Sequence, residues 1–130
     1  MRKESKTKVH GFWFSLGKLE SITGLDNLDT SKVIDFSSMF SGCSELKELN
    51  ISCFNTSSAK YMDHMFAGLE SVDELDLHSF ETSNVISMEG MFEFGGYSVL
   101  SLSNFDTSQV INMNSMFNYC TNIKNRFVII

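Results

Sequence analysis

The sequence of 130 residues contains no proline and only three cysteines, and none of its apolar runs is long. Average usage of about 5% would give roughly six or seven prolines in a chain of this length. No apolar stretch approaches the roughly 18 residues that a membrane-spanning helix requires. The cysteines form no CxxC motif and no Cys/His cluster at zinc-binding spacing. The sequence therefore predicts no membrane span, no zinc site and no small disulfide-stapled scaffold.

Basic residues are also few. Ten Lys and Arg stand against sixteen Asp and Glu, which gives a net charge of −6. Nucleic-acid binding depends on neutralising phosphates with Lys and Arg, so this charge argues against a nucleic-acid partner. Apolar residues make up 42% and charged residues 20%, which is typical of a globular chain rather than a disordered one. At this length we expect one domain, with the twelve phenylalanines supplying much of its core.

Residues 1–10 hold four of the ten basic residues: Arg2, Lys3, Lys6 and Lys8. A secretory signal begins with a similar basic region, but the segment that follows, GFWFSLGKLESITGL, is interrupted by Gly, Ser, Lys and Glu. It provides no apolar core for a signal peptide. We therefore expect residues 1–10 to form a short, solvated basic tail. A basic patch that contacts anionic surfaces is the alternative.

A sequence repeat fills most of the chain. Four segments align without gaps: LDTSKVIDFSSMF from Leu28, FNTSSAKYMDHMF from Phe54, FETSNVISMEGMF from Phe80 and FDTSQVINMNSMF from Phe105. Their starts are 26, 26 and 25 residues apart, and the Thr-Ser and Met-Phe pairs recur in all four. We expect four tandem units: 28–53, 54–79, 80–104 and 105–130. Residues 11–27, with Trp13-Phe14 in place of Met-Phe, form a degenerate first repeat or cap.

The first half of each unit has the spacing of a short helix. In the first unit, Val33, Phe36, Met39 and Phe40 are spaced by three, three and one, which places them on one helical face. The preceding Thr-Ser pair is a helix-start signal, since a hydroxyl there serves the free amides of the first turn. Because the same columns recur with Met and Phe, we expect these residues to form the core.

The second half of each unit reads as a short strand. Leu49 and Ile51 alternate with Asn50 and Ser52, so the leucine-type residues face inward and the polar residues outward. We expect the turn between helix and strand at Gly42, at Gly68 and at Gly95 or Gly96. One such unit cannot bury its apolar face alone, but stacked units can. The predicted fold is α/β: a leucine-rich-repeat-like solenoid of four to five turns of short strand plus short helix, with a parallel sheet on one side.

The pattern L-x-x-L-x-L followed by F-[DNE]-T-S-x-V-x-x-M-x-x-M-F resembles the repeat of the BspA-type leucine-rich-repeat surface proteins of bacteria. The resemblance covers about residues 11–130. It implies a protein at the cell surface or secreted, in which such units mediate adhesion to host or matrix components. It also implies longer arrays whose export and anchoring segments lie outside the repeats, so we expect this chain to be a segment of such an array.

The end of the sequence is apolar. Residues 127–130 read FVII, without the polar cap that solenoids need for solubility. An open strand edge of this kind invites pairing with another chain. This edge is therefore a candidate for end-to-end association.

The outward strand positions give the one broad surface that repeats. It is polar and mildly acidic, and it consists of Glu48, Asn50, Ser52, Glu74, Asp76, His78, Ser101 and Ser103. Solenoids commonly bind their partners on this side, so we take these residues as a candidate partner-binding face, with Glu74, Asp76 and His78 at its centre. An ordinary solvated sheet face is the alternative.

The sequence offers little for catalysis. Cys53 and His78 lie at nearly equivalent positions of neighbouring units and are the candidate nucleophile and base of a cysteine hydrolase. Strand alternation, however, directs adjacent positions to opposite faces, and neither an orienting third residue nor an oxyanion-hole motif is present. Residues 26–29 lack the glycine and terminal Glu of a calcium loop, and no Gly-rich phosphate loop occurs. We predict no enzymatic activity, no cofactor and no metal site.

The sequence therefore predicts a non-enzymatic repeat module of a bacterial surface or secreted protein. Its expected role is adhesion or interaction with a protein or glycan partner, such as a host or matrix component. The alternative is a structural spacer within a longer array, with no ligand of its own.

Overall fold

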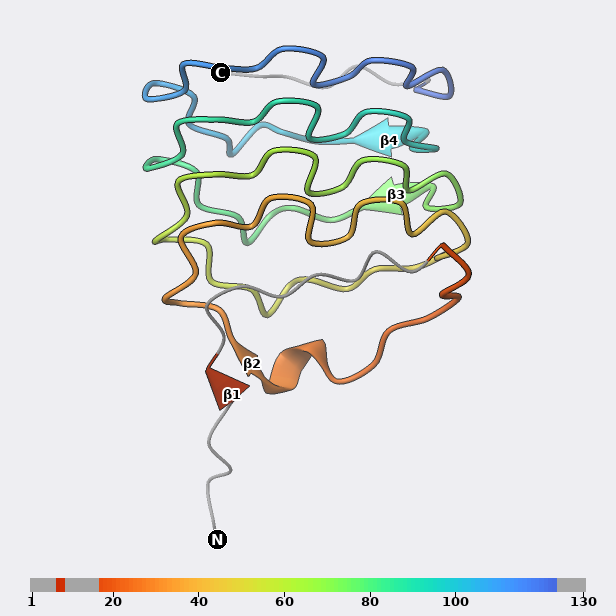
Figure 1. Ribbon diagram of the computed structural model, residues 1–130, viewed down its shortest axis with the longest axis horizontal. Coiled ribbons are helices and arrows are strands. Elements are labelled where there is room, and N and C mark those ends of the chain that lie inside the picture. Colours follow the sequence, from red (N-terminus) through yellow and green to blue (C-terminus); the bar gives the residue numbers. More distant parts are fainter. Residues whose placement is uncertain (1–6, 9–16, 124–130) are drawn as a thin grey trace, which may run out of the picture.

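Four successive segments of the chain lie one above another as layers (Figure 1). The computed structural model describes residues 7–8 and 17–123, and the four layers correspond to residues 28–53, 54–79, 80–104 and 105–123. Regular elements in the described residues are short: β1 (Thr7–Lys8), the 3-10 helix η1 (Leu25–Asn27), β2 (Leu28–Asp29), β3 (Glu74–Leu75) and β4 (Val99–Leu100). Strand β1 pairs in parallel with β2, and β3 pairs in parallel with β4.

Backbone hydrogen bonds between equivalent positions join the layers. The amide of Phe36 donates to the carbonyl of Tyr61 at 2.9 Å, and the amide of Met62 donates to the carbonyl of Ser87 at 3.0 Å. Parallel bridges connect Asp35, Tyr61, Ser87 and Asn112 in one column. These bridge residues are 26, 26 and 25 positions apart, so the sequence period is also the period of the backbone.

The helix predicted in the first half of each unit is wrong. Over the described residues no α-helix occurs, and these segments consist of turns and extended backbone. Alternate amides bond to the next layer instead of to a carbonyl four residues back, and left-handed backbone at Ser38 (φ 61°) and His64 (φ 54°) interrupts any helical run. Local bonds span three residues, as from the Met39 amide to the Phe36 carbonyl at 3.2 Å. Three-residue turns bring the same apolar residues inward as a helical face would.

The interior of the stack holds the predicted rows of phenylalanine and methionine. The rings of Phe40, Phe66, Phe92 and Phe117 form one column, with successive centroids 5.9, 5.9 and 5.8 Å apart and planes within 11° of parallel. Six of the seven methionines in repeat columns are buried: Met39, Met62, Met65, Met88, Met91 and Met116. The seventh, Met113, lies in the last described layer and is 42% exposed. The predicted core is therefore confirmed for the first three layers and, in part, for the fourth.

The third layer is one residue shorter than the first two, and an aromatic ring fills the space beside the shortened segment. The register of β3 and β4 pairs Glu74 with Val99, which puts Tyr97 in the column that Val72 occupies one layer below. Tyr97 is fully buried, and its hydroxyl donates to the carbonyl of Phe66 at 2.8 Å. A Cβ atom at Gly95 would collide with the Tyr97 ring, so glycine is required there to admit the ring.

The predicted turn glycines are correct in two layers and wrong in the third. Gly42 and Gly68 have φ angles of 78° and 73°. In the third and fourth layers the equivalent left-handed residues are Phe94 and Tyr119, with φ angles of 57° and 59°. Gly95 makes room for a side chain instead of forming the left-handed turn.

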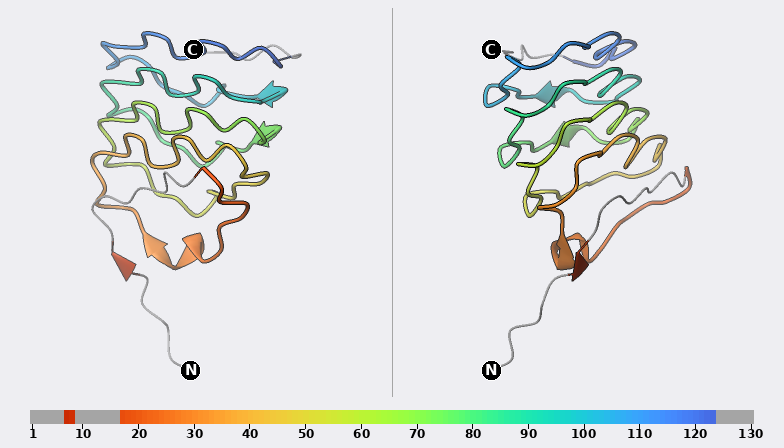
Figure 2. Two further views of the ribbon diagram at one scale, coloured as in Figure 1. Left: turned by 45° about the vertical axis from the view of Figure 1, so that its right-hand side comes forward. Right: turned by 60° about the vertical axis from the view of Figure 1, so that its left-hand side comes forward.

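The N-terminal end of the stack differs from the other layers. Thr7 and Lys8, which belong to the predicted solvated tail, pair with Leu28 and Asp29 of the first layer. The segment before β2, in orange, diverges from the layers above it and does not stack parallel to them (Figure 2), although Leu25 is buried in the core. The rest of the predicted tail, Trp13-Phe14 and the apolar residues 127–130 lie outside the described residues. In the part of the chain that the structure describes, no helix is long and apolar enough to cross a membrane.

Candidate functional site

The strand positions predicted to face outward do so. In the first layer Glu48, Asn50 and Ser52 are exposed, while Leu49 and Ile51 between them are buried. The same alternation holds in the second layer, where Glu74, Asp76 and His78 are exposed. In the third layer Ser101 and Ser103 are exposed. Parallel stacking with a constant register brings these residues onto one surface, which we call the sheet face.

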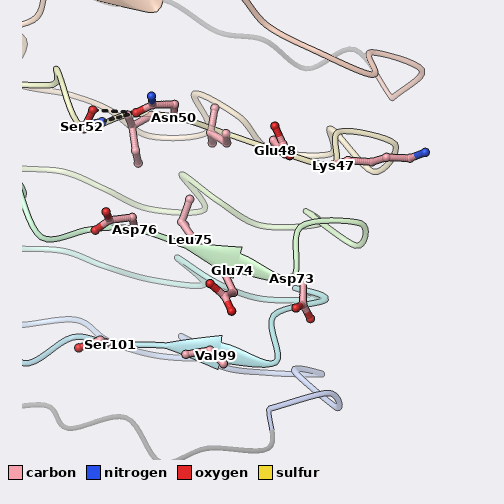
Figure 3. A pocket seen from close by; sticks show the side chains of 12 residues that line it. Lys47, Glu48, Asn50, Ser52, Asp73, Glu74, Leu75, Asp76, Val99 and Ser101 are labelled. Atoms are coloured by element: carbon pink, nitrogen blue, oxygen red, sulfur yellow. Dashed lines mark hydrogen bonds between the residues drawn. The ribbon is translucent and has the colours of Figure 1, made fainter.

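An open depression of about 720 Å³ runs across the sheet face over three layers (Figure 3). Its lining comprises Lys47, Glu48, Leu49, Asn50, Ile51, Ser52, Asp73, Glu74, Leu75, Asp76, Val99 and Ser101. Six of the eight predicted residues are therefore brought together here. The other two, His78 and Ser103, line a neighbouring hollow of about 170 Å³ that shares Leu75, Asp76 and Ser101 with the depression.

The depression is acidic. Four carboxylates line it, those of Glu48, Asp73, Glu74 and Asp76, and one ammonium group, that of Lys47. Figure 3 shows the Lys47 side chain extending away from these carboxylates. Asp73 and Lys47 are absent from the predicted set, because the prediction followed only the outward positions within each strand. The sequence does contain a signal for these two residues, because Lys47 and Asp73 occupy the repeat position directly before Glu48 and Glu74.

Hydrogen bonds within each layer hold the polar side chains of the sheet face in place. The His78 amide donates to Oδ1 of Asp76 at 3.0 Å, and Nδ1 of His78 lies 2.7 Å from the same oxygen. The bond from the His78 amide, followed by that from its side chain, holds the pKa of Asp76 below its ordinary value of 3.8. In the first layer the amide and hydroxyl of Ser52 donate to Oδ1 of Asn50 at 3.1 and 2.7 Å.

The sheet face offers hydrogen bonding and negative charge more than nucleophilic chemistry. Cys53 and Cys120 are free thiols, and Cys53 is half-buried. The imidazole of His78 is paired with the exposed carboxylate of Asp76. Within residues 7–8 and 17–123, no three His, Cys, Asp or Glu side chains gather in a group that could hold a metal ion.

The repeat can be compared with known families now that its register and exposed face are defined. The model of a Mycoplasma protein family of unknown function, DUF285, matches residues 11–128. The chain belongs to this family. It is thus a bacterial repeat protein, and the DUF285 match includes the four stacked layers as well as the segment that precedes them. Neither the curated proteins nor the solved structures compared with this DUF285 chain give a match.

Proposed function

We propose that this DUF285 chain is a non-enzymatic binding module whose sheet face binds a protein partner at the bacterial surface or after secretion. In this proposal the layers form a leucine-rich-repeat-like solenoid related to the BspA-type surface repeats. The observation that carries the proposal is the depression of about 720 Å³, to which three successive layers contribute exposed polar side chains. Repeat proteins use such extended surfaces for binding.

The charge of the depression favours a basic partner. Its four carboxylates outnumber its one ammonium group, and opposite charge on a partner would speed encounter and fix the orientation of the complex. A neutral glycan could donate hydrogen bonds to these carboxylates but would gain no attraction between opposite charges. We therefore expect a protein segment rich in Lys and Arg to lie across the layers, with its cations near Glu74 and Asp76.

A triple variant tests the proposal without disturbing the fold. Asp76→Asn and His78→Ser reproduce the residues of the first layer, where Asn50 and Ser52 form the equivalent turn. Glu74→Gln completes the variant and keeps the side-chain length. The probes are immobilised basic peptides and a panel of extracellular-matrix proteins.

The unmodified chain is expected to bind at least one probe saturably, and the affinity should fall as salt is added. The triple variant should weaken binding by about tenfold or more. The control variant Glu45→Gln/Glu81→Gln also removes two negative charges, from exposed positions outside the depression, and should bind like the unmodified chain. Absence of saturable binding by the unmodified chain would support the spacer alternative and contradict the proposal.

A further inference from the structure

A second surface feature lies at the turn that precedes each strand. The first two layers place Gly42 and Gly68 in left-handed backbone at this turn, and the third and fourth layers place Phe94 and Tyr119 there. A positive φ is free of cost for glycine but unfavourable for an aromatic residue. The stack therefore carries two strained aromatic residues at positions where its own repeat also accepts glycine.

Burial in the core does not explain these rings. Phe94 is 48% exposed and Tyr119 is 62% exposed. Their centroids are 4.7 Å apart and their planes differ by 8°, so the two rings form one stacked pair on the surface. One layer below Phe94 the equivalent residue is Gly68, which has no side chain to cover the ring. An exposed aromatic pair on left-handed backbone, at positions where the repeat also accepts glycine, points to a function.

A cavity of about 340 Å³ adjoins the ring pair. Besides Phe94 and Tyr119, it is lined by Glu70, Thr121 and Asn122, whose side chains carry a carboxylate, a hydroxyl and an amide. The cavity is open and its surface is mostly polar, so it suits a ligand rich in hydroxyls more than an apolar one. None of its lining residues belongs to the depression on the sheet face.

We propose that Phe94 and Tyr119 form a stacking platform for a pyranose ring of a neutral oligosaccharide. A pyranose has a C–H face that fits against the electron-rich face of an aromatic ring, and hydroxyls at its rim. Glu70 accepts hydrogen bonds from such hydroxyls, while Thr121 and Asn122 both donate and accept them. This glycan site is distinct from the proposed protein site on the sheet face.

The geometry favours a sugar over two other ligands that bind aromatic residues. A quaternary ammonium ion is held by rings that surround it, whereas these two rings are parallel and stack on each other, so they do not enclose a cation. Nucleobases also stack on aromatic rings, but their phosphates would meet the Glu70 carboxylate and a chain with a net charge of −6.

The experiment titrates the full chain with neutral hexasaccharides of the chitin, cellulose, amylose and mannan types, and follows binding by calorimetry and saturation-transfer NMR. At least one should bind, with magnetisation passing between the sugar and the ring protons of Phe94 and Tyr119. The variant Phe94→Gly/Tyr119→Gly restores the residue of the first two layers. It should keep an unfolding midpoint close to that of the unmodified chain and lose binding by about tenfold or more.

Two controls separate this site from other effects. Tyr61→Ala removes an exposed aromatic ring outside the cavity and should bind the sugar unchanged. The triple variant of the sheet face should also retain sugar binding, while the Phe94→Gly/Tyr119→Gly variant should retain protein binding. The proposal is overturned if no hexasaccharide binds, if the glycine variant binds as well as the unmodified chain, or if saturation of the aromatic ring protons is not transferred to the sugar.

Discussion

The hydroxyl oxygen of Thr56 lies 2.8 Å from both the amide nitrogen and the carbonyl oxygen of Glu81, one layer above it. The Glu81 amide donates to this hydroxyl, and the hydroxyl donates to the Glu81 carbonyl. Thr30 makes the same pair of bonds with Asn55, and Thr82 makes it with Asp106. Thr56 is 1% exposed, so the hydroxyl end of these part-buried bonds lies inside the stack. Thr30, Thr56 and Thr82 therefore join the layers at a position where the described strands do not pair.

Removing this hydroxyl should destabilise the stack. Thr56→Val keeps the shape of the side chain but leaves the amide and carbonyl of Glu81 without their hydroxyl partner. The two bonds are part-buried, and one hydrogen bond contributes about 0.5–1.5 kcal/mol, so we expect a loss of about 1–3 kcal/mol in the free energy of unfolding. The measurement is urea denaturation.

Thr56→Ser is the matched control, because it retains the hydroxyl and should recover most of the lost stability. A second control, Ser83→Ala, changes an exposed hydroxyl in the next layer and should alter the free energy by less than about 0.5 kcal/mol. Equal stability of the valine and serine variants would contradict the bridging role of Thr56.

The period, the core and the outward face could be predicted from the sequence because each depends on burial. Leu49 and Ile51 must be shielded from water while Asn50 and Ser52 must not, and alternation in the sequence records this directly. The acidic surface follows from the same alternation. Its exact lining does not follow from alternation, because Asp73 lies just before the alternating positions of its strand.

The local backbone could not be predicted in the same way. Turns that close every three residues bury Val33, Phe36 and Met39 just as a helical face does, so the apolar spacing fits both structures. The Thr-Ser pair is equally ambiguous, because its partner backbone is about one repeat away in sequence and not in the next helical turn. The sequence shows that Phe94 and Tyr119 stand where the first two units have glycine. It does not show that the backbone stays left-handed at these two residues.

The column of stacked phenylalanines should be the most sensitive part of the core. Phe66 is fully buried, with the rings of Phe40 and Phe92 each 5.9 Å away on either side. Phe66→Ala removes the ring and leaves a cavity between two layers, for which we expect a cost of roughly 3–5 kcal/mol. Denaturant unfolding measures this value, with Tyr61→Ala as an exposed aromatic control. A cost below about 1 kcal/mol would show that the column is not core.

The bond between Asp76 and His78 should be visible in the titration of the carboxyl group. In the folded chain the Asp76 pKa lies below 3.8, chiefly because the His78 amide donates to it. The stabilisation from this shift is present above the ordinary pKa and is lost as the pH falls through the lowered value. Carboxyl-detected NMR measures the pKa directly.

His78→Ala separates the two contributions to this pKa, because alanine offers no side-chain donor in place of the imidazole. The variant keeps the backbone amide but removes the imidazole, so the Asp76 pKa should rise only partly toward 3.8. A full return to 3.8 would mean that the imidazole, and not the amide, dominates. An unshifted pKa in the unmodified chain would contradict the turn geometry.

Tyr97 should make the fold sensitive to alkaline pH. Its burial, followed by the proximity of Cys120, raises its pKa well above 10.0 in the folded chain. The neutral phenol is thus favoured by folding. This stabilisation is complete below pH 10.0 and is lost as the pH rises beyond it, where the unfolded chain ionises first.

Tyr97→Phe also removes the bond to the Phe66 carbonyl, so near neutral pH the variant should be less stable by about 1 kcal/mol. Because phenylalanine does not ionise, the gap in the free energy of unfolding between the unmodified chain and the variant should narrow above pH 10.0. Urea unfolding across this range measures the gap, and parallel pH profiles for the two chains would show that Tyr97 is not shielded from water.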